Sequence, residues 1–189
     1  MNVIFLDFDG VLNTLSEFTL SAEEKLINKE KRIKILSEIC KKYNCKIVIE
    51  ASIKQFIDED TLKTDVDWVN EIFDLFKKYD IKCIGRTPEV KKKINDYSSY
   101  PIWKEYEIRK YLFNHPEIDH YVVIDDDDAQ ILCGKSDLDM IRNHLVKTEI
   151  YSKNKEEEGL LQKHINEVEE KLKIENEIKK FALKRNINI

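Results

Sequence analysis

Short hydrophobic runs alternate along the chain with longer segments in which hydrophobic residues recur at helical spacing. Most of the short runs are hydrophobic at nearly every position and end at polar residues, as strands do when both faces of their sheet are covered. The predicted strands are residues 2–6, 45–49, 81–85, 120–124 and 144–148. The pattern therefore predicts strands and helices in alternation.

Three segments between these strands have the spacing of amphipathic helices. They are residues 21–44, 65–79 and 104–113. In the first of them Ser21 is placed to cap the helix, and Glu24 three residues later completes a capping box. We expect residues 10–20 to form a loop.

A long amphipathic helix is predicted over residues 155–185. Its hydrophobic stripe contains Leu161, Ile165, Val168 and Leu172. Such a stripe packs either against the rest of the domain or against a second copy of the chain. A homo-oligomer joined through this helix is therefore one expectation.

Alternating strands and helices predict an α/β fold, a Rossmann-like parallel sheet of five strands with helices on both faces. No repeat or low-complexity linker divides the chain, so we expect one domain over residues 1–150 and a helical extension over residues 151–189. Ligands of such sheets bind beyond the carboxyl ends of the strands. Chemically active residues are expected just after residues 6, 49, 85 and 124.

The composition supports a globular domain and narrows its setting. Of 189 residues, 42% are hydrophobic and 37% are charged, with four glycines and three prolines, which argues against disorder and against a turn-rich β-sandwich. A net charge of −5 argues against binding nucleic acid through bulk positive charge. No hydrophobic run is long enough to cross a membrane, and Asp7 and Asp9 interrupt the N-terminal one. We expect no signal peptide, no membrane partner and a cytoplasmic location.

Neither the cysteines nor the histidines form a metal or catalytic pattern. No CxxC pair and no histidine at zinc-ligand spacing accompanies the cysteines, so we expect reduced thiols. The cysteines are Cys40, Cys45, Cys83 and Cys133. The scattered histidines, each expected to be structural or exposed, are His115, His120, His144 and His164.

Carboxylates gather after two of the predicted strands. Asp7 and Asp9 follow the first strand, and four consecutive aspartates, Asp125 to Asp128, follow the fourth. If these strands are neighbours, the carboxylates converge, and two charges about 4 Å apart repel by about 4 kcal/mol at an effective dielectric of about 20. A hard divalent cation with oxygen ligands relieves that repulsion, and Mg²⁺ fits best because one or two carboxylates plus substrate phosphate usually hold it.

The stretches FLDFDGVLN (residues 5–13) and VVIDDDD (residues 122–128) resemble the first and fourth motifs of the haloacid dehalogenase-like (HAD) hydrolases. Further stretches occur in an order similar to the phosphatase-like domain of Swiss-army-knife RNA repair proteins. They are CKIVIEASIK, IGRTPEV, WKEYEIRKYL and LVKT. The resemblance covers about residues 2–150. It implies a Mg²⁺-dependent phosphatase that hydrolyses a phosphate monoester through an aspartyl-phosphate intermediate.

The resemblance also implies roles for individual residues. Asp7 would be the nucleophile, and Asp9 the general acid and then the general base. Asp7, the main-chain carbonyl of Asp9, Asp125 and Asp126 would hold Mg²⁺, with Asp125 as a direct ligand. Gly10 would leave room for backbone amides to face the phosphoryl group.

Two further motifs of the family are less sharply marked in this chain. Lys104, 21 residues before Asp125, is the best match for the lysine that shields the charge of nucleophile and phosphate, with Lys54 and Arg86 as rivals. The family places a serine or threonine after the second strand to bind the phosphate. Here Ser52 offers the hydroxyl, but Glu50 precedes it. If position 50 is the functional one, a carboxylate faces the phosphate pocket.

Neither residues 10–44 nor residues 86–103 are long enough to hold a cap domain, so we expect an open, capless site. Similarity to the RNA-repair domain favours a nucleotide or a nucleic-acid terminal phosphate as the substrate. Cations near the rim would attract such a polyanion, namely Arg86, Lys91, Lys92 and Lys93. Aromatic residues there either stack on bases or pack in the core, namely Tyr97, Tyr100 and Trp103.

Two other functions compete with a phosphatase. A catalytically impaired HAD-like binding module would keep the metal site but lose turnover, for example through Glu50. A phospho-receiver domain is also a parallel α/β fold with acidic residues, but its phosphorylated aspartate should follow the third strand, where this chain has IGRTP. The sequence therefore disfavours the receiver.

Overall fold

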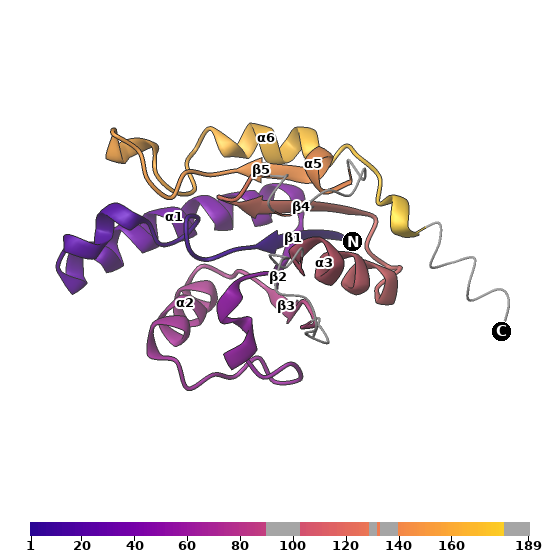
Figure 1. The fold of residues 1–189 in the computed structure, drawn as a ribbon, viewed down its shortest axis with the longest axis horizontal. Helices are drawn as coiled ribbons and strands as arrows, with labels where there is room; N and C mark the ends of the chain where they lie inside the picture. The colour runs from indigo at the N-terminus through magenta and orange to yellow at the C-terminus, as the bar shows by residue number, and fades with distance from the viewer. Residues whose placement is uncertain (90–102, 129–131, 133–139, 180–189) are drawn as a thin grey trace, which may run out of the picture.

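A five-stranded parallel sheet forms the centre of the molecule (Figure 1). The computed structural model describes residues 1–89, 103–128, 132 and 140–179. The strands are β1 (Asn2–Leu6), β2 (Cys45–Ile49), β3 (Cys83–Arg86), β4 (His120–Asp125) and β5 (Leu145–Lys147), in the order β3-β2-β1-β4-β5. The predicted α/β fold with five parallel strands is confirmed, and each strand lies close to its predicted position.

Helices pack on both faces of this sheet. The α-helices are α1 (Ala22–Tyr43), α2 (Asp67–Lys78), α3 (Trp103–Asn114), α5 (Met140–His144) and α6 (His164–Lys171). Three short 3-10 helices join them, η1 (Leu15–Thr19), η2 (Ser52–Phe56) and η3 (Lys155–Glu157). Buried residues of α1, α2 and α6 share one hydrophobic cluster, and those of α3 and α5 share another. None of the helices in the described ranges is long and apolar enough to cross a membrane.

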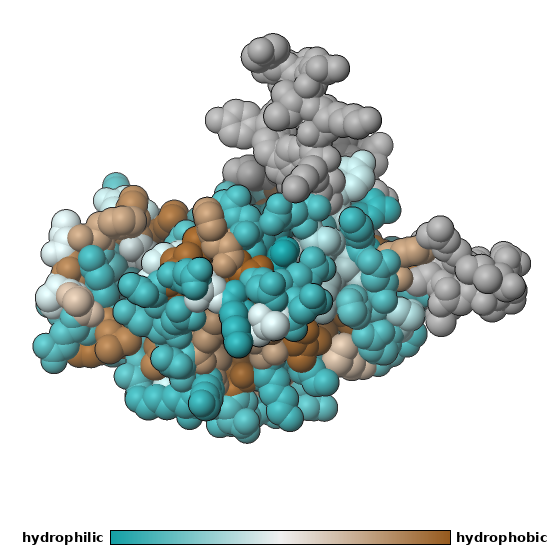
Figure 2. All heavy atoms as spheres, turned by 90° about the horizontal axis from the view of Figure 1, so that it is seen from below, coloured by the Kyte–Doolittle hydropathy of each residue, from teal (hydrophilic) through white to brown (hydrophobic). Residues whose placement is uncertain are grey.

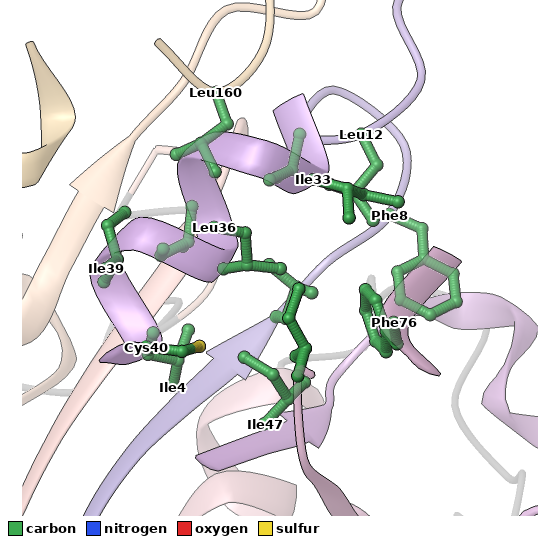
Figure 3. Packing of buried hydrophobic residues seen from close by; sticks show 14 of the residues in the cluster. Ile4, Phe8, Leu12, Ile33, Leu36, Ile39, Cys40, Ile47, Phe76 and Leu160 are labelled. Carbon is green, nitrogen blue, oxygen red and sulfur yellow. The ribbon is translucent and has the colours of Figure 1, made fainter. Parts of the chain in front are cut away.

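The strands are hydrophobic on both faces because each face meets a different core cluster. On β1, Ile4 and Leu6 face the α1 side, whereas Val3 and Phe5 face the α3 side. All four side chains are fully buried. Figure 3 shows Leu36 of α1 above this central part of the sheet. The continuous hydrophobic run therefore fixes β1 in the middle of the sheet, with a paired strand on each side.

Helix α1 begins and ends where local chemistry predicts. The Ser21 side chain accepts a hydrogen bond from the Glu24 N–H, and the Ser21 N–H donates to the Glu24 carboxylate at 2.9 Å, so the predicted capping box is confirmed. At the other end Asn44 adopts a left-handed conformation with φ of 51°. That turn leads directly into β2, which pairs with β1.

The continuous helix predicted over residues 155–185 is wrong. Residues 155–157 form η3, and α6 covers only His164–Lys171. Gly159 interrupts the helical pattern with φ of +72°, and its N–H donates to the Glu149 carbonyl. The next N–H, of Leu160, donates to the Val11 carbonyl at 2.9 Å, so this stretch binds the loop after β1 instead of continuing a helix.

Part of the predicted hydrophobic stripe still packs in the core. Ile165 and Val168 of α6 are buried in the cluster on the α1 side of the sheet. Residues 180–185, the end of the predicted helix, lie outside the described residues. Cys40, Cys45 and Cys83 are free thiols, and burial raises the pKa of Cys40 and of Cys45 to about 12, so both stay protonated and inert at neutral pH.

Candidate active site

The parallel pairing of β1 with β4 brings the two acidic motifs together. Leu6 lies opposite Ile124, and the Asp7 N–H donates to the Ile124 carbonyl at 3.0 Å. The residue after each of these two is an aspartate. Asp7 directly follows β1, and Asp125 is the last residue of β4. Residues more than a hundred positions apart in the chain therefore meet at the carboxyl edge of the sheet.

Three carboxylates converge at this edge. Asp7, Asp125 and Asp126 each have a carboxylate oxygen within 4.8 Å of the others. Asp125 is fully buried, and Asp7 is 8% exposed. Gly10 makes room for the third group, because a Cβ on Gly10 would lie 2.2 Å from Cγ of Asp126, and Gly10 has φ of +75°. The glycine after the DxD motif thus admits a carboxylate to the site.

Lys104, at the start of α3, lies between two of these aspartates. Its Nζ donates to Oδ2 of Asp7 at 2.6 Å and to Oδ2 of Asp125 at 2.7 Å. Asp127 lies farther away, at 3.8 Å from the same nitrogen. The two rival cations, Lys54 and Arg86, are paired elsewhere. Of the three candidate residues, Lys104 is the one that the structure places against Asp7.

Burial and mutual repulsion disturb the protonation of the aspartates. Burial and the Asp7 charge raise the pKa of Asp125 to about 7, although Lys104 pulls it down. Burial, Asp7 and Asp127 raise the pKa of Asp126 to about 6. Burial also raises the pKa of Asp7, again against Lys104. Although burial alone lowers it, Asp7 and Asp125 raise the pKa of Lys104 above its ordinary value, so it is a permanent cation.

Asp9 lies at the mouth of the site instead of among the three carboxylates. Its side chain is exposed, and Oδ1 accepts a hydrogen bond from Nδ2 of Asn13 at 3.2 Å. The Gly10 N–H donates to the Asn13 carbonyl at 2.7 Å, so this amide is occupied within the turn. Thr148, after β5, donates its hydroxyl to the Gly10 carbonyl at 2.8 Å and ties the turn to the sheet.

Ser52 and Glu50 take different positions after β2. Ser52 is exposed at the start of η2, and among the described residues its hydroxyl makes no hydrogen bond. Glu50 is buried, and its carboxylate accepts hydrogen bonds from the Lys54 ammonium at 2.9 Å and from the Thr87 hydroxyl. Burial raises the pKa of Glu50 to about 8, although Lys54 and Thr87 stabilise its charged form.

The Lys54 ammonium is the centre of a buried polar network that the sequence pattern did not reveal. It donates to Glu50, to the Thr87 hydroxyl at 2.7 Å and to the carboxylate of Glu107. These residues come from β2, η2, β3 and α3 or directly follow them. Because Glu107 lies one turn after Lys104 on α3, the network fixes the helix that carries Lys104. The Glu50–Lys54 spacing of four was the available signal.

The remaining predicted residues lie apart from the aspartates or outside the described part of the chain. Arg86, the last residue of β3, faces Glu59 at 3.7 Å and donates to the Thr87 carbonyl at 3.3 Å. Its Nε is buried without a hydrogen-bond partner among the described residues. The predictions for Lys91, Lys92, Lys93, Tyr97, Tyr100 and Cys133, and for the side chain of Trp103, lie outside the described residues.

Comparison with known protein families agrees with this geometry. Residues 3–164 match the model of a family described as the HAD domain in Swiss Army Knife RNA repair proteins. The chain belongs to this family. The resemblance seen in the two acidic motifs is thereby confirmed, and this HAD domain is a HAD-type hydrolase by family. No curated protein and no solved structure matched the chain.

Proposed function

We propose that this HAD domain is a Mg²⁺-dependent phosphatase that hydrolyses a phosphate monoester through an aspartyl-phosphate on Asp7. The observation that carries the proposal is the convergence of Asp7, Asp125 and Asp126 with Lys104 between two of them. An acidic cluster with one lysine holds excess negative charge in a buried position. Such an arrangement is costly unless a cation offsets the charge, and that cation would then attract an anionic substrate.

The donor set fits Mg²⁺. Carboxylate oxygens are hard ligands, and Mg²⁺ usually takes one or two of them together with phosphate and water. Asp7, Asp125, Asp126 and the Asp9 main-chain carbonyl would hold the ion. When bound, it would offset the charge of the carboxylates and of the phosphate.

In the first step the Asp7 carboxylate attacks phosphorus. A bond forms between an Asp7 oxygen and phosphorus, and the bond between phosphorus and the leaving oxygen breaks. Asp9 donates a proton to that oxygen, so the alcohol leaves neutral. Lys104 holds Oδ2 of Asp7 and the neighbouring Asp125, which fixes the direction of attack and balances negative charge.

In the second step water replaces Asp7 at phosphorus. Asp9 takes a proton from the water, whose oxygen bonds to phosphorus as the Asp7–phosphorus bond breaks. The sum of both steps is one ester and one water converted to one alcohol and one inorganic phosphate. The exposed Ser52 hydroxyl and the Arg86 guanidinium are the proposed further contacts to the phosphoryl oxygens.

The test is release of inorganic phosphate. A panel of phosphorylated metabolites and of oligonucleotides with 5′- or 3′-phosphates is incubated with Mg²⁺ or with EDTA. We expect release that requires Mg²⁺ and that falls by at least about 10³-fold in Asp7→Asn, because the amide cannot form the covalent intermediate. Equal turnover by Asp7→Asn and wild type would contradict the proposal.

A catalytically impaired binding module is the alternative, and Glu50 is the observation that favours it. If position 50 is the one where the family has a hydroxyl, a carboxylate stands there instead. In the structure this carboxylate is paired with Lys54 and Thr87, so it offers no hydroxyl to a phosphate. A preparation that binds Mg²⁺ and phosphate esters, yet turns over none of the panel, would establish this alternative.

Two expectations extend this proposal. The site is open, without a cap domain: residues 10–44 contain a turn, η1 and α1, and residues 90–102 lie outside the described residues. The substrate is a nucleotide or a nucleic-acid terminal phosphate, which is supported by the family's occurrence in RNA repair proteins.

A further inference from the structure

A hollow of about 630 Å³ lies beside Asp9, and none of the three clustered carboxylates lines it. Its walls include Asp9, Leu15, Phe18, Lys25, Trp68 and Ile150. These residues come from the loop after β1, from α1, from α2 and from the segment after β5. Because Asp9 forms part of the wall, a group bonded to an oxygen at Asp9 would have this hollow beside it.

Exposed hydrophobic side chains surround the hollow. Two of them belong to η1: Phe18 is 77% exposed, and Leu15 is 49% exposed. Ile150, whose carbonyl accepts a hydrogen bond from the Leu15 N–H at 2.9 Å, is also exposed. Figure 2 shows hydrophobic side chains at the surface near the end of the molecule that contains the start of α1 in Figure 1. Exposed apolar groups that line a hollow next to a reactive carboxylate are typical of a ligand site.

Trp68 is held in place by the nucleophile motif itself. Its ring meets the buried ring of Phe8 edge-on, with the ring centroids 6.2 Å apart. Phe8 stands between Asp7 and Asp9 in the chain, so the position of Trp68 is coupled to that of both aspartates. Trp68 is only partly buried, which leaves part of its ring available to a ligand.

The hollow also carries positive charge. Lys25 is half-buried and, among the described residues, has no carboxylate within ion-pair distance. Lys29 pairs with the exposed Glu71 at 3.2 Å. The one buried acid of the wall, Glu17, is neutralised by Arg32 at 2.6 Å.

A second hollow, of about 610 Å³ beside Arg86, has the opposite character. It contains Asp58, Glu59, Asp60 and Asp65 against Lys63 and Arg86. The excess of carboxylates makes this hollow less suited to an anionic leaving group than the hollow beside Asp9.

We infer that the hollow beside Asp9 receives the leaving group of the substrate, and that this group carries an aromatic ring. The inference rests on the proposed function, because Asp9 must serve the leaving oxygen. Phe18 and Trp68 offer ring faces and edges for stacking, and Lys25 offers a cation for a further polar or anionic group on the same ligand. Nucleotides and aryl phosphates both have an aromatic ring in the leaving group, whereas sugar phosphates have none.

Binding to a variant that cannot turn over tests the inference separately from catalysis. In Asp7→Asn with Mg²⁺, calorimetry compares adenosine 5′-monophosphate, phenyl phosphate and ribose 5-phosphate. We expect the two esters with an aromatic ring to bind at least about fivefold more tightly than ribose 5-phosphate. Tighter binding of the nucleotide than of phenyl phosphate would identify a base and sugar as the occupant. Equal binding of all three esters would overturn the inference.

Matched phenylalanine variants locate the ring. In the same background Phe18→Ala should remove the preference for esters with an aromatic ring, whereas Phe56→Ala should leave it unchanged, because Phe56 is also exposed but lines the acidic hollow. The reverse result would place the leaving group beside Arg86 and overturn the inference. Both residues are exposed, so circular dichroism should show both variants folded.

The outcomes separate this inference from the proposed function. If wild type releases no phosphate from any ester but Asp7→Asn still prefers ring-bearing ligands through Phe18, the phosphatase proposal fails and the binding site stands. If wild type is an active phosphatase with equal kcat/KM for adenosine 5′-monophosphate and ribose 5-phosphate, the phosphatase stands and the inference fails.

Discussion

At the scale of single residues, the site concentrates charge that the fold alone does not balance. Burial and Asp7 raise the pKa values of Asp125 and Asp126, so both resist ionisation in the protein without metal. An acid whose pKa is raised on folding destabilises the folded state once the pH exceeds its ordinary value. The aspartates therefore reduce stability at neutral pH, and a cation bound by them would restore it.

Asp126→Asn tests this balance. The amide removes one repelling charge and leaves the contacts of Lys104 with Asp7 and Asp125 intact. At pH 8 in EDTA, the melting temperature should rise by about 2–4 °C, the shift for about 1 kcal/mol in a chain of this length. Wild type should gain stability from Mg²⁺ and the variant should gain little. If the variant melts at a lower temperature than wild type in EDTA and is stabilised by Mg²⁺ as much as wild type, Asp126 neither destabilises the protein without metal nor binds the ion.

Gly10→Ala tests why the motif contains a glycine. A Cβ would lie 2.2 Å from Cγ of Asp126, and φ of +75° is strained for alanine. We expect a loss of at least about 1 kcal/mol in the free energy of unfolding, together with loss of stabilisation by Mg²⁺. Gly85→Ala on β3 is the control, where the nearest contact is the Tyr111 hydroxyl. A Gly10→Ala protein with a normal response to Mg²⁺ would show that Asp126 is not needed there.

At the scale of elements, the structure shows which sequence signals are sufficient. The start of α1 was predictable because Ser21 and Glu24 lie within one turn and bond each other's backbone. The acidic edge was predictable because hydrophobic runs mark β1 and β4, and an aspartate ends each. The C-terminal helix was mispredicted because spacing alone does not reveal that Gly159 bonds the chain to a segment near β5.

The Lys54 network was not predictable for the same reason. Glu50, Lys54, Thr87 and Glu107 come from four places in the chain and meet only after β2 and β3 pair and α3 packs. The spacing of four residues between Glu50 and Lys54 points to that one pair and gives no sign of Thr87 or Glu107. The sequence indicated Lys104 only by its place 21 residues before Asp125. Its contacts with Asp7 and Asp125 depend on where α3 lies.

Lys54→Met tests whether this network holds the elements together. Removing the ammonium leaves Glu50 and Glu107 buried without their shared cation, which should lower the free energy of unfolding by about 3–5 kcal/mol. Lys78→Met is the matched control, because Lys78 pairs with Glu30 at the surface, and its urea midpoint should stay close to wild type. Equal midpoints for the two variants would show that the network contributes little to stability.

At the scale of the whole molecule, two buried histidines oppose stability in acid. Burial lowers the pKa of His144 and of His164 to about 4. His144 stacks on Tyr121 with the ring centroids 3.8 Å apart, and Nδ1 of His164 accepts the Leu161 N–H at 3.0 Å. Between about pH 6.5 and 4 these two rings bind more protons in the unfolded chain than in the folded one, so their own contribution lowers stability as the pH falls, opposite in sign to that of Asp125 and Asp126.

Urea unfolding of His144→Gln and His164→Gln at pH 7.5 and pH 4.5 checks this expectation. Each ring accounts for at most about 3 kcal/mol, so each variant should lose less stability on acidification than wild type does. His115→Gln, which removes an exposed ring, is the control and should follow wild type. If all three variants and wild type lose stability equally, the buried histidines do not determine acid sensitivity.

The covalent intermediate is the most direct test of the account as a whole. Wild-type protein is mixed with Mg²⁺ and a phosphate ester that it hydrolyses, quenched in acid within one turnover, and mapped by peptide mass spectrometry. We expect one phosphoryl group on the peptide that contains Asp7, absent with EDTA and absent from Asp7→Asn. A phosphoryl group on another residue, or single-turnover hydrolysis with no adduct at any quench time, would contradict the assignment of Asp7.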